Sequence, residues 1–154
     1  MNVSRETVAA ALLTLLQPTQ YTLPGGQPTL FQTVGRNVQT WGAIAGGDQP
    51  AMFIVHSGEQ IVQSQAYGLS KYMLHFELVI YARADASPAA VPDTLINAML
   101  DAIDAQMQSA PKGERQTLGG VVYHAWIEGD VFIDSGILDQ QIAMLVPVKV
   151  LTGI

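Results

Sequence analysis

An uninterrupted alternation over residues 71–83 constrains this chain more than any other feature. Leu74, Phe76, Leu78 and Ile80 occupy every second position, and Tyr72 continues the same series. The positions between them mix charged, polar and apolar side chains. Because side chains point alternately to the two faces of a strand, this period of two predicts a long strand with one wholly apolar face. Such a pattern is typical of an antiparallel sheet that is covered on one side.

Two other stretches repeat with the period of a helix. In residues 4–17, Val8 and Leu12 share an apolar face with two further leucines, Ser4 is placed to cap the start, and Pro18 stops the helix. The second helix opens at Pro92, a residue favoured in the first helical turn, and ends near residues 111–114. Both stretches therefore predict amphipathic helices that pack against a sheet.

The remaining elements are shorter strands. We expect them at residues 29–34, 51–56, 121–127, 131–133 and 141–151, with Ser57 and Gly58 ending the second. Pro147 has no amide hydrogen to donate, which predicts that the last strand is an edge strand or is bulged there. Residues 17–28, 42–50 and 84–91 are expected to be loops or linkers. The order predicts one α+β domain over residues 1–154, a sandwich-like fold with a mainly antiparallel or mixed sheet and two main helices on one face.

Composition narrows the range of functions. The 154 residues carry 7 Lys+Arg against 13 Asp+Glu, a net charge of −6, which argues against a basic surface that grips nucleic acid. Only 13% of residues are charged, about half the usual share of roughly 25%. A surface poor in charge is easy to desolvate and favours self-assembly. The absence of cysteine excludes disulfides and thiolate zinc sites, and no apolar run is long enough for a membrane span.

Candidate chemical groups are sparse. His75 and Glu77 project from the same face of the predicted long strand, which suits a cross-strand hydrogen bond better than a metal site. His56 and Glu59 flank a predicted turn. His124, Glu128, Asp130 and Asp134 form a loose cluster without the spacing of a calcium loop. No nucleophile elbow or phosphate loop is present in the sequence. We therefore expect no enzyme activity, no catalytic residue, no bound metal and no cofactor.

Several residues are instead candidates for contacts between subunits or with partner proteins. Trp41 and Trp126 are large aromatic residues of the type that anchors interfaces, the alternative being that they are ordinary core residues. Arg36 and Arg83 are rare cations in an acidic chain. We hypothesise that they pair across a subunit boundary with Glu128 or Asp130, the alternative being that they are simply solvated. The strand that contains Pro147 completes this set as a candidate exposed edge.

Taken in order, several segments resemble the tail terminators of long-tailed phages, also called the tail completion or minor tail protein U family. The segments are RETVAAALLTLL, TVGRNVQTW, DQPAMFIVHSGE, the strand ending in YAR, LINAMLDAIDA and LGGVVYHAWIEGDVFIDSGILDQQIAMLVPVKVL. Each segment alone is weakly specific, and their succession over most of the chain carries the resemblance.

The resemblance implies a structural virion protein rather than an enzyme. It implies a ring of subunits, usually a hexamer, on the last ring of the tail tube, where it ends tube growth and presents a surface to the head–neck connector. Expected partners are other copies of the chain, the tail tube protein and the connector. DNA passes through the lumen without sequence-specific binding, no membrane is involved, and the protein is made in the host cytoplasm and ends in the virion tail. The alternatives are a head–tail joining (neck) protein and a small metal- or ligand-binding α+β enzyme that uses His75, Glu77 or the cluster around Asp130.

Overall fold

The computed structural model describes residues 3–63, 70–83, 91–108, 113–136 and 141–153. The helices are α1 (Arg5–Leu16) and α2 (Pro92–Met107), with the short 3-10 helices η1 (Trp41–Ala43) and η2 (Gly46–Asp48). The strands are β1 (Gln20–Tyr21), β2 (Thr29–Leu30), β3 (Thr33–Gly35), β4 (Ala51–Gln63), β5 (Lys71–Arg83), β6 (His124–Ile127), β7 (Phe132–Asp134) and β8 (Gln141–Gly153). This is an α+β fold, as the sequence predicts.

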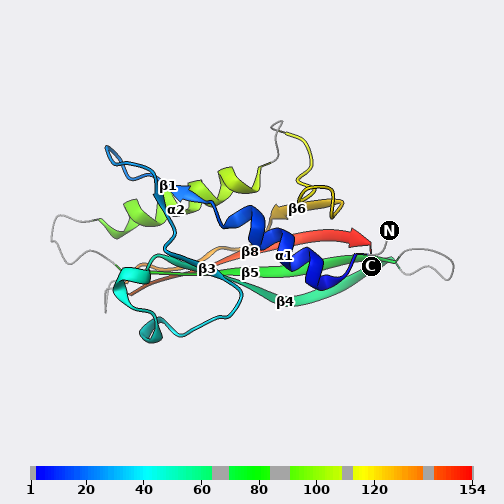
Figure 1. Ribbon diagram of the computed structural model, residues 1–154, viewed down its shortest axis with the longest axis horizontal. Helices are drawn as coiled ribbons and strands as arrows, with labels where there is room; N and C mark the ends of the chain where they lie inside the picture. The colour runs from blue at the N-terminus through cyan, green and yellow to red at the C-terminus, as the bar shows by residue number, and fades with distance from the viewer. Residues whose placement is uncertain (1–2, 64–69, 84–90, 109–112, 137–140, 154) are drawn as a thin grey trace.

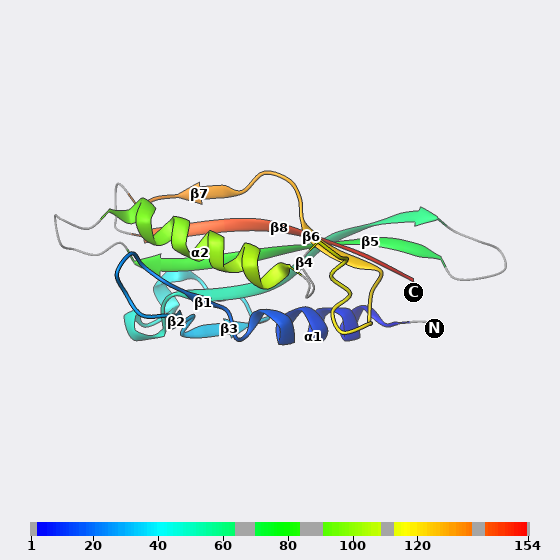
Figure 2. The ribbon, with the colours of Figure 1, turned by 90° about the horizontal axis from the view of Figure 1, so that it is seen from above.

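One mixed, strongly curled sheet forms the body of the molecule (Figure 1). Its order is β3-β4-β5-β8-β6, and β7 also pairs with β8. The β3–β4 pair is parallel, and the other ladders of this sheet are antiparallel. β1 and β2 form a separate small ladder. Seen from above, β7 lies on the opposite side of the sheet from β3 (Figure 2).

The two faces of the sheet differ, as the alternation in β5 predicts. The side chains of Leu74, Phe76, Leu78 and Ile80 are at most 2% exposed, whereas the residues between them are half-buried. Both long helices cover this apolar face and share one core with it (Figure 1). The other face is covered in part by the η1–η2 segment, where Ile44 packs with Phe53 and Ala51.

The helix signals are confirmed closely. The Ser4 side chain accepts a hydrogen bond from the Thr7 amide at 3.1 Å and caps α1, whose buried face includes Val8 and Leu12. Pro92 stands in the first turn of α2, and α2 ends at Met107, earlier than the predicted end near residues 111–114. Residues 84–90 of the linker predicted at 84–91, and residues 109–112, lie outside the described residues.

Strand boundaries depart from the prediction at several places. β4 continues through Ser57 and Gly58, which were expected to end it, because a register shift between His56 and Gly58 absorbs one extra residue as a bulge. The single strand expected at 29–34 is divided between β2 and β3, and β1 was not expected. β6 begins only at His124, because Gly119 and Gly120 adopt positive φ and turn the chain first.

Candidate functional site

Arg36 has a partner within its own chain. It follows β3, and its guanidinium binds the carboxylate of Glu6, in the first turn of α1, through both terminal nitrogens. The hydrogen bonds from Arg36, followed by its positive charge, lower the pKa of the Glu6 carboxyl. The pair ties the start of α1 to the end of β3, which is a role within the subunit.

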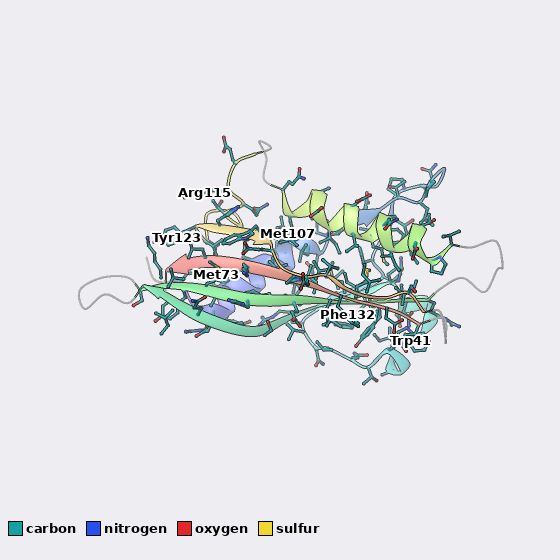
Figure 3. All side chains as sticks on the ribbon, turned by 180° about the vertical axis from the view of Figure 1, so that it is seen from behind. Trp41, Met73, Met107, Arg115, Tyr123 and Phe132 are labelled. Carbon is teal, nitrogen blue, oxygen red and sulfur yellow. The ribbon has the colours of Figure 1, made fainter. Side chains whose placement is uncertain are left out.

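Trp41 and Arg83 lie together at one end of the sheet. The indole Nε1 of Trp41 donates to the carbonyl of Ala82 at 3.3 Å, and Arg83 is the last residue of β5 (Figure 3 labels Trp41). Arg83 packs against Gly46, where an added Cβ would lie 2.9 Å from Nη1 of Arg83. Within the described ranges Arg83 is exposed and forms no ion pair.

Trp126, Glu128 and Lys149 form a second group, across β6 and β8. Trp126 stacks on His124 with ring centroids 4.8 Å apart and planes 18° apart. Its Nε1 donates to the Glu128 carboxylate at 3.3 Å, and Lys149 Nζ lies 2.9 Å from the same oxygen. Hydrogen bonding by Lys149, and then by Trp126, lowers the pKa of Glu128. Glu128, like Arg36, is therefore already paired inside one subunit.

The prediction that Pro147 marks an edge strand is wrong. β8 pairs with β5 on one side and with β6 and β7 on the other, and the β5 ladder passes Pro147 opposite Glu77 without a shift. The irregularity lies in the facing segment 128–131, between β6 and β7. There the Glu128 backbone amide donates to the Pro147 carbonyl at 3.3 Å. Pro147 has no amide hydrogen, and the facing segment 128–131 is outside the ladder, so no regular strand hydrogen bond is lost there.

Gly129 and Asp130 make this interruption possible. Gly129 has a φ of +123°, and a Cβ there would lie 3.1 Å from Cγ of Pro147. The position therefore needs glycine for both its backbone angle and its space. Asp130 follows in the exposed turn and forms no ion pair within the described part of the chain.

A cavity of about 390 Å³ lies between the end of α2 and β6. Met107 and Ala125 supply apolar wall, and Asp104, His124 and Trp126 supply polar and aromatic wall. The cavity is open to solvent on one side. The stacked pair His124–Trp126 lies in the wall of this cavity.

Gln116 organises this corner and was missed by the sequence analysis. The backbone amide of Gln116 donates to Nδ1 of His124 at 3.1 Å. Its side-chain nitrogen donates to the carbonyls of Met107 and Gln108 at 3.3 and 3.2 Å. A polar residue in a loop carries no periodic signal, and only its burial, with 9% exposed, reveals the role.

The described residues offer no set of side chains that could bind a metal ion. In the described ranges, no three His, Cys, Asp or Glu side chains are grouped so that they could hold a metal ion. His75 Nε2 is buried without a hydrogen-bond partner in these ranges, and His75 and Glu77 do not pair. His56 lies 3.5 Å from Glu59, on a continuous strand rather than on a turn. Glu59 binds Arg5 through two hydrogen bonds of 2.6 Å, and that contact lowers the pKa of Glu59.

The structure thus brings the predicted interface residues into two groups. Trp126, Glu128 and Pro147 gather around β8, with Asp130 in the exposed turn that follows Glu128 and Gly129. Trp41 and Arg83 lie at the end of β5, while Arg36 is separate. No model of a known protein family matches the sequence, and no curated protein sequence matches it. No helix among the described residues has the length and apolar character needed to cross a membrane.

Proposed function

We propose that this chain is a structural protein of a phage virion, a tail terminator that forms a ring at the end of the tail tube. In this role it stops tube polymerisation and offers the surface to which the head–neck connector attaches. The ring would be a homo-oligomer, in the family usually a hexamer, assembled in the host cytoplasm and retained in the tail.

One observation carries the proposal beyond the sequence resemblance. The most exposed large apolar side chains of the sheet stand at its margins, with Ile61 60% and Phe132 61% exposed. Exposed apolar groups concentrated at the margins of a sheet are a feature of proteins that associate. A charge of −6 adds support, because DNA that slides through a lumen must not be held by basic side chains.

Tube growth in vitro tests the proposal directly. Purified tail tube protein from a long-tailed phage is polymerised with increasing amounts of this chain, and tube lengths are measured by electron microscopy. We expect the mean tube length to fall as the chain is added and a ring of added density to appear at one tube end. Unchanged tube lengths, with tube proteins from several such phages, would overturn the proposal.

A second role, binding of a small ligand, has the cavity beside Trp126 in its favour. The Trp126 indole borders that cavity, so a bound ligand would change its fluorescence. A screen of small metabolites and divalent cations, read by fluorescence and by native mass spectrometry, separates the two functions. A stoichiometric ligand on a chain that leaves tube growth unchanged would replace the assembly role with a binding role.

A further inference from the structure

The sheet leaves two edges without a strand partner, one on each side. β3 pairs with β4 only opposite Ala51–Phe53, so the outer edge of β4 from residue 54 onward faces no strand in the described ranges. Among the strands that the structure describes, β7 pairs with β8 alone. The strand order places these two edges on opposite sides of the sheet.

Each edge carries a pair of exposed apolar residues. Ile61 and Val62 on β4 are 60% and 51% exposed, and Phe132 and Ile133 on β7 are 61% and 45% exposed. Because consecutive strand residues point to opposite faces, each pair offers apolar surface above and below the strand. Figure 3 shows Phe132 in the half of the molecule nearer Trp41, whereas Met73, which pairs with Gln60 on β4, lies toward the other end.

Proteins usually protect such edges with lysine, proline or bulges. The three residues of β7, Phe132–Asp134, include neither lysine nor proline. β4 has register shifts between His56 and Gly58 and between Ile61 and Gln63, but residues 58–61 between them pair regularly with β5. That run of four residues is long enough to accept the three residues of β7.

The charges beside the two edges differ, because the β7 edge is acidic and the β4 edge is neutral. β7 is flanked by Asp130 and contains Asp134. At the β4 edge, Arg5 and Glu59 neutralise each other in a bidentate pair. Lys71 on β5 places its Nζ over the ring of Tyr123, 5.9 Å from the ring centroid, on the side of β5 away from β4. The acidic residues of β7 disfavour the approach of two β7 edges, whereas the neutral β4 edge does not repel β7.

We propose that β7 of one copy of this chain adds as a strand to the outer edge of β4, at residues 58–61, of a second copy. The contact is head-to-tail, because it joins two different patches, and repeating it produces a ring when the rotation closes. The inference rests on the proposed function in one respect: it names the subunit contact of the proposed ring.

Two single substitutions, each of which blocks one edge, provide the test. Phe132→Asp places a charge on β7 and leaves β4 free, and Ile61→Asp does the reverse. Leu30→Asp is the matched control, because Leu30 is 47% exposed on β2 and lies at neither edge. Phe132→Ser serves in place of Phe132→Asp if the latter is poorly folded, and circular dichroism checks the fold of every variant.

Native mass spectrometry and sedimentation velocity are run over a concentration series. We expect the wild type and Leu30→Asp to form the same oligomers. Each blocked variant alone should stay monomeric, with its dissociation constant raised at least about tenfold, which is the effect of losing roughly 1.4 kcal/mol of contact energy. An equimolar mixture of the two blocked variants should give a one-to-one dimer and nothing larger, because it retains one intact β7 edge and one intact β4 edge.

Several results would overturn the inference. A monomeric wild type at every concentration, oligomers of a blocked variant equal to those of the wild type, or no dimer in the mixture would each do so. The tube-growth assay reports separately on the proposed function. If Phe132→Asp still shortens tubes as the wild type does, the subunit contact is wrong and the terminator function stands. If the edges pair as described and tube growth is unaffected, the contact stands and the terminator function fails.

Discussion

The two faces of the central sheet should respond differently to the same truncation. Val146 on β8 points to the helix-covered face and is 1% exposed, whereas Val79 on the neighbouring β5 is half-buried on the opposite face. Val146→Ala and Val79→Ala remove the same two methyl groups from central strands. Both variants therefore lose the same intrinsic preference for a strand. The difference between their free energies of unfolding then reports how deeply each side chain is buried.

The structure sets the size of the effect. Two buried methyl groups are worth about 0.8 kcal/mol each, and the cavity left in a closed core adds to this, so Val146→Ala should lower the free energy of unfolding by about 2–3 kcal/mol. Water or neighbouring side chains can fill the space left at Val79, and that variant should lose about 1 kcal/mol. For a chain of about 150 residues, Val146→Ala should lower the Tm by about 4–12 °C.

Urea unfolding followed by tryptophan fluorescence measures both losses. The slope of free energy against urea should be the same in all three proteins, so that the shift in midpoint gives the change in stability. Equal losses for the two variants, or a larger loss for Val79→Ala, would refute the account of a sheet covered by helices on one face only.

Three further predictions follow from particular contacts. Lys149→Met should raise the pKa of Glu128, because the hydrogen bond from Lys149 is the largest cause of the lowered pKa of that carboxyl. An NMR titration of the Glu128 carboxyl carbon measures the change in pKa. An unchanged titration midpoint would count against the Lys149–Glu128 ion pair. In the wild type, the stabilisation from Glu128 is present above the unfolded pKa of about 4.3 and is lost as the pH falls through the lower folded value. Gly129→Ala should reduce the free energy of unfolding by about 1–3 kcal/mol, because Gly129 has positive φ and lies against Pro147. Gly35→Ala is the control: nothing lies within 4 Å of the added Cβ, so we expect little effect on stability. The same urea assay measures both variants. Arg83→Glu should weaken self-association and tail joining, and Arg115→Glu is the control variant with the same change of charge. Sedimentation velocity and the tube-growth assay measure both variants. If Arg83→Glu behaves as the wild type does in both assays, Arg83 is not an interface residue.

The sequence predicted those elements whose signal is local and uninterrupted. β5 has a period of two over its full length, and α1 and α2 have a cap or a proline at the start, so local chemistry and tertiary packing agree there. β4 was predicted too short because Ser57 and Gly58 are typical of turns. Only the β5 ladder, which pairs on both sides of Ser57, shows that the strand continues.

The candidate site was less predictable, because it depends on contacts between residues far apart in the chain. The Arg36–Glu6 and Arg5–Glu59 pairs span 30 and 54 positions, and no spacing rule connects them. Pro147 shows the same limit. A proline excludes an amide hydrogen bond on one side of a strand, but the sequence does not show that the facing strand is interrupted at that place.

The ionic contacts of the subunit bear on how neighbouring copies associate. Three of the chain's seven basic residues, Arg5, Arg36 and Lys149, already bind carboxylates of their own subunit. Such exposed pairs contribute little to stability, but they leave few cations for contacts with another copy. The exposed apolar side chains and unpaired backbone groups of β4 and β7 are then the main source of binding energy in the proposed contact. The acidic residues Asp130 and Asp134 would determine which edges meet, by disfavouring a contact between two β7 edges, rather than how tightly β7 binds β4.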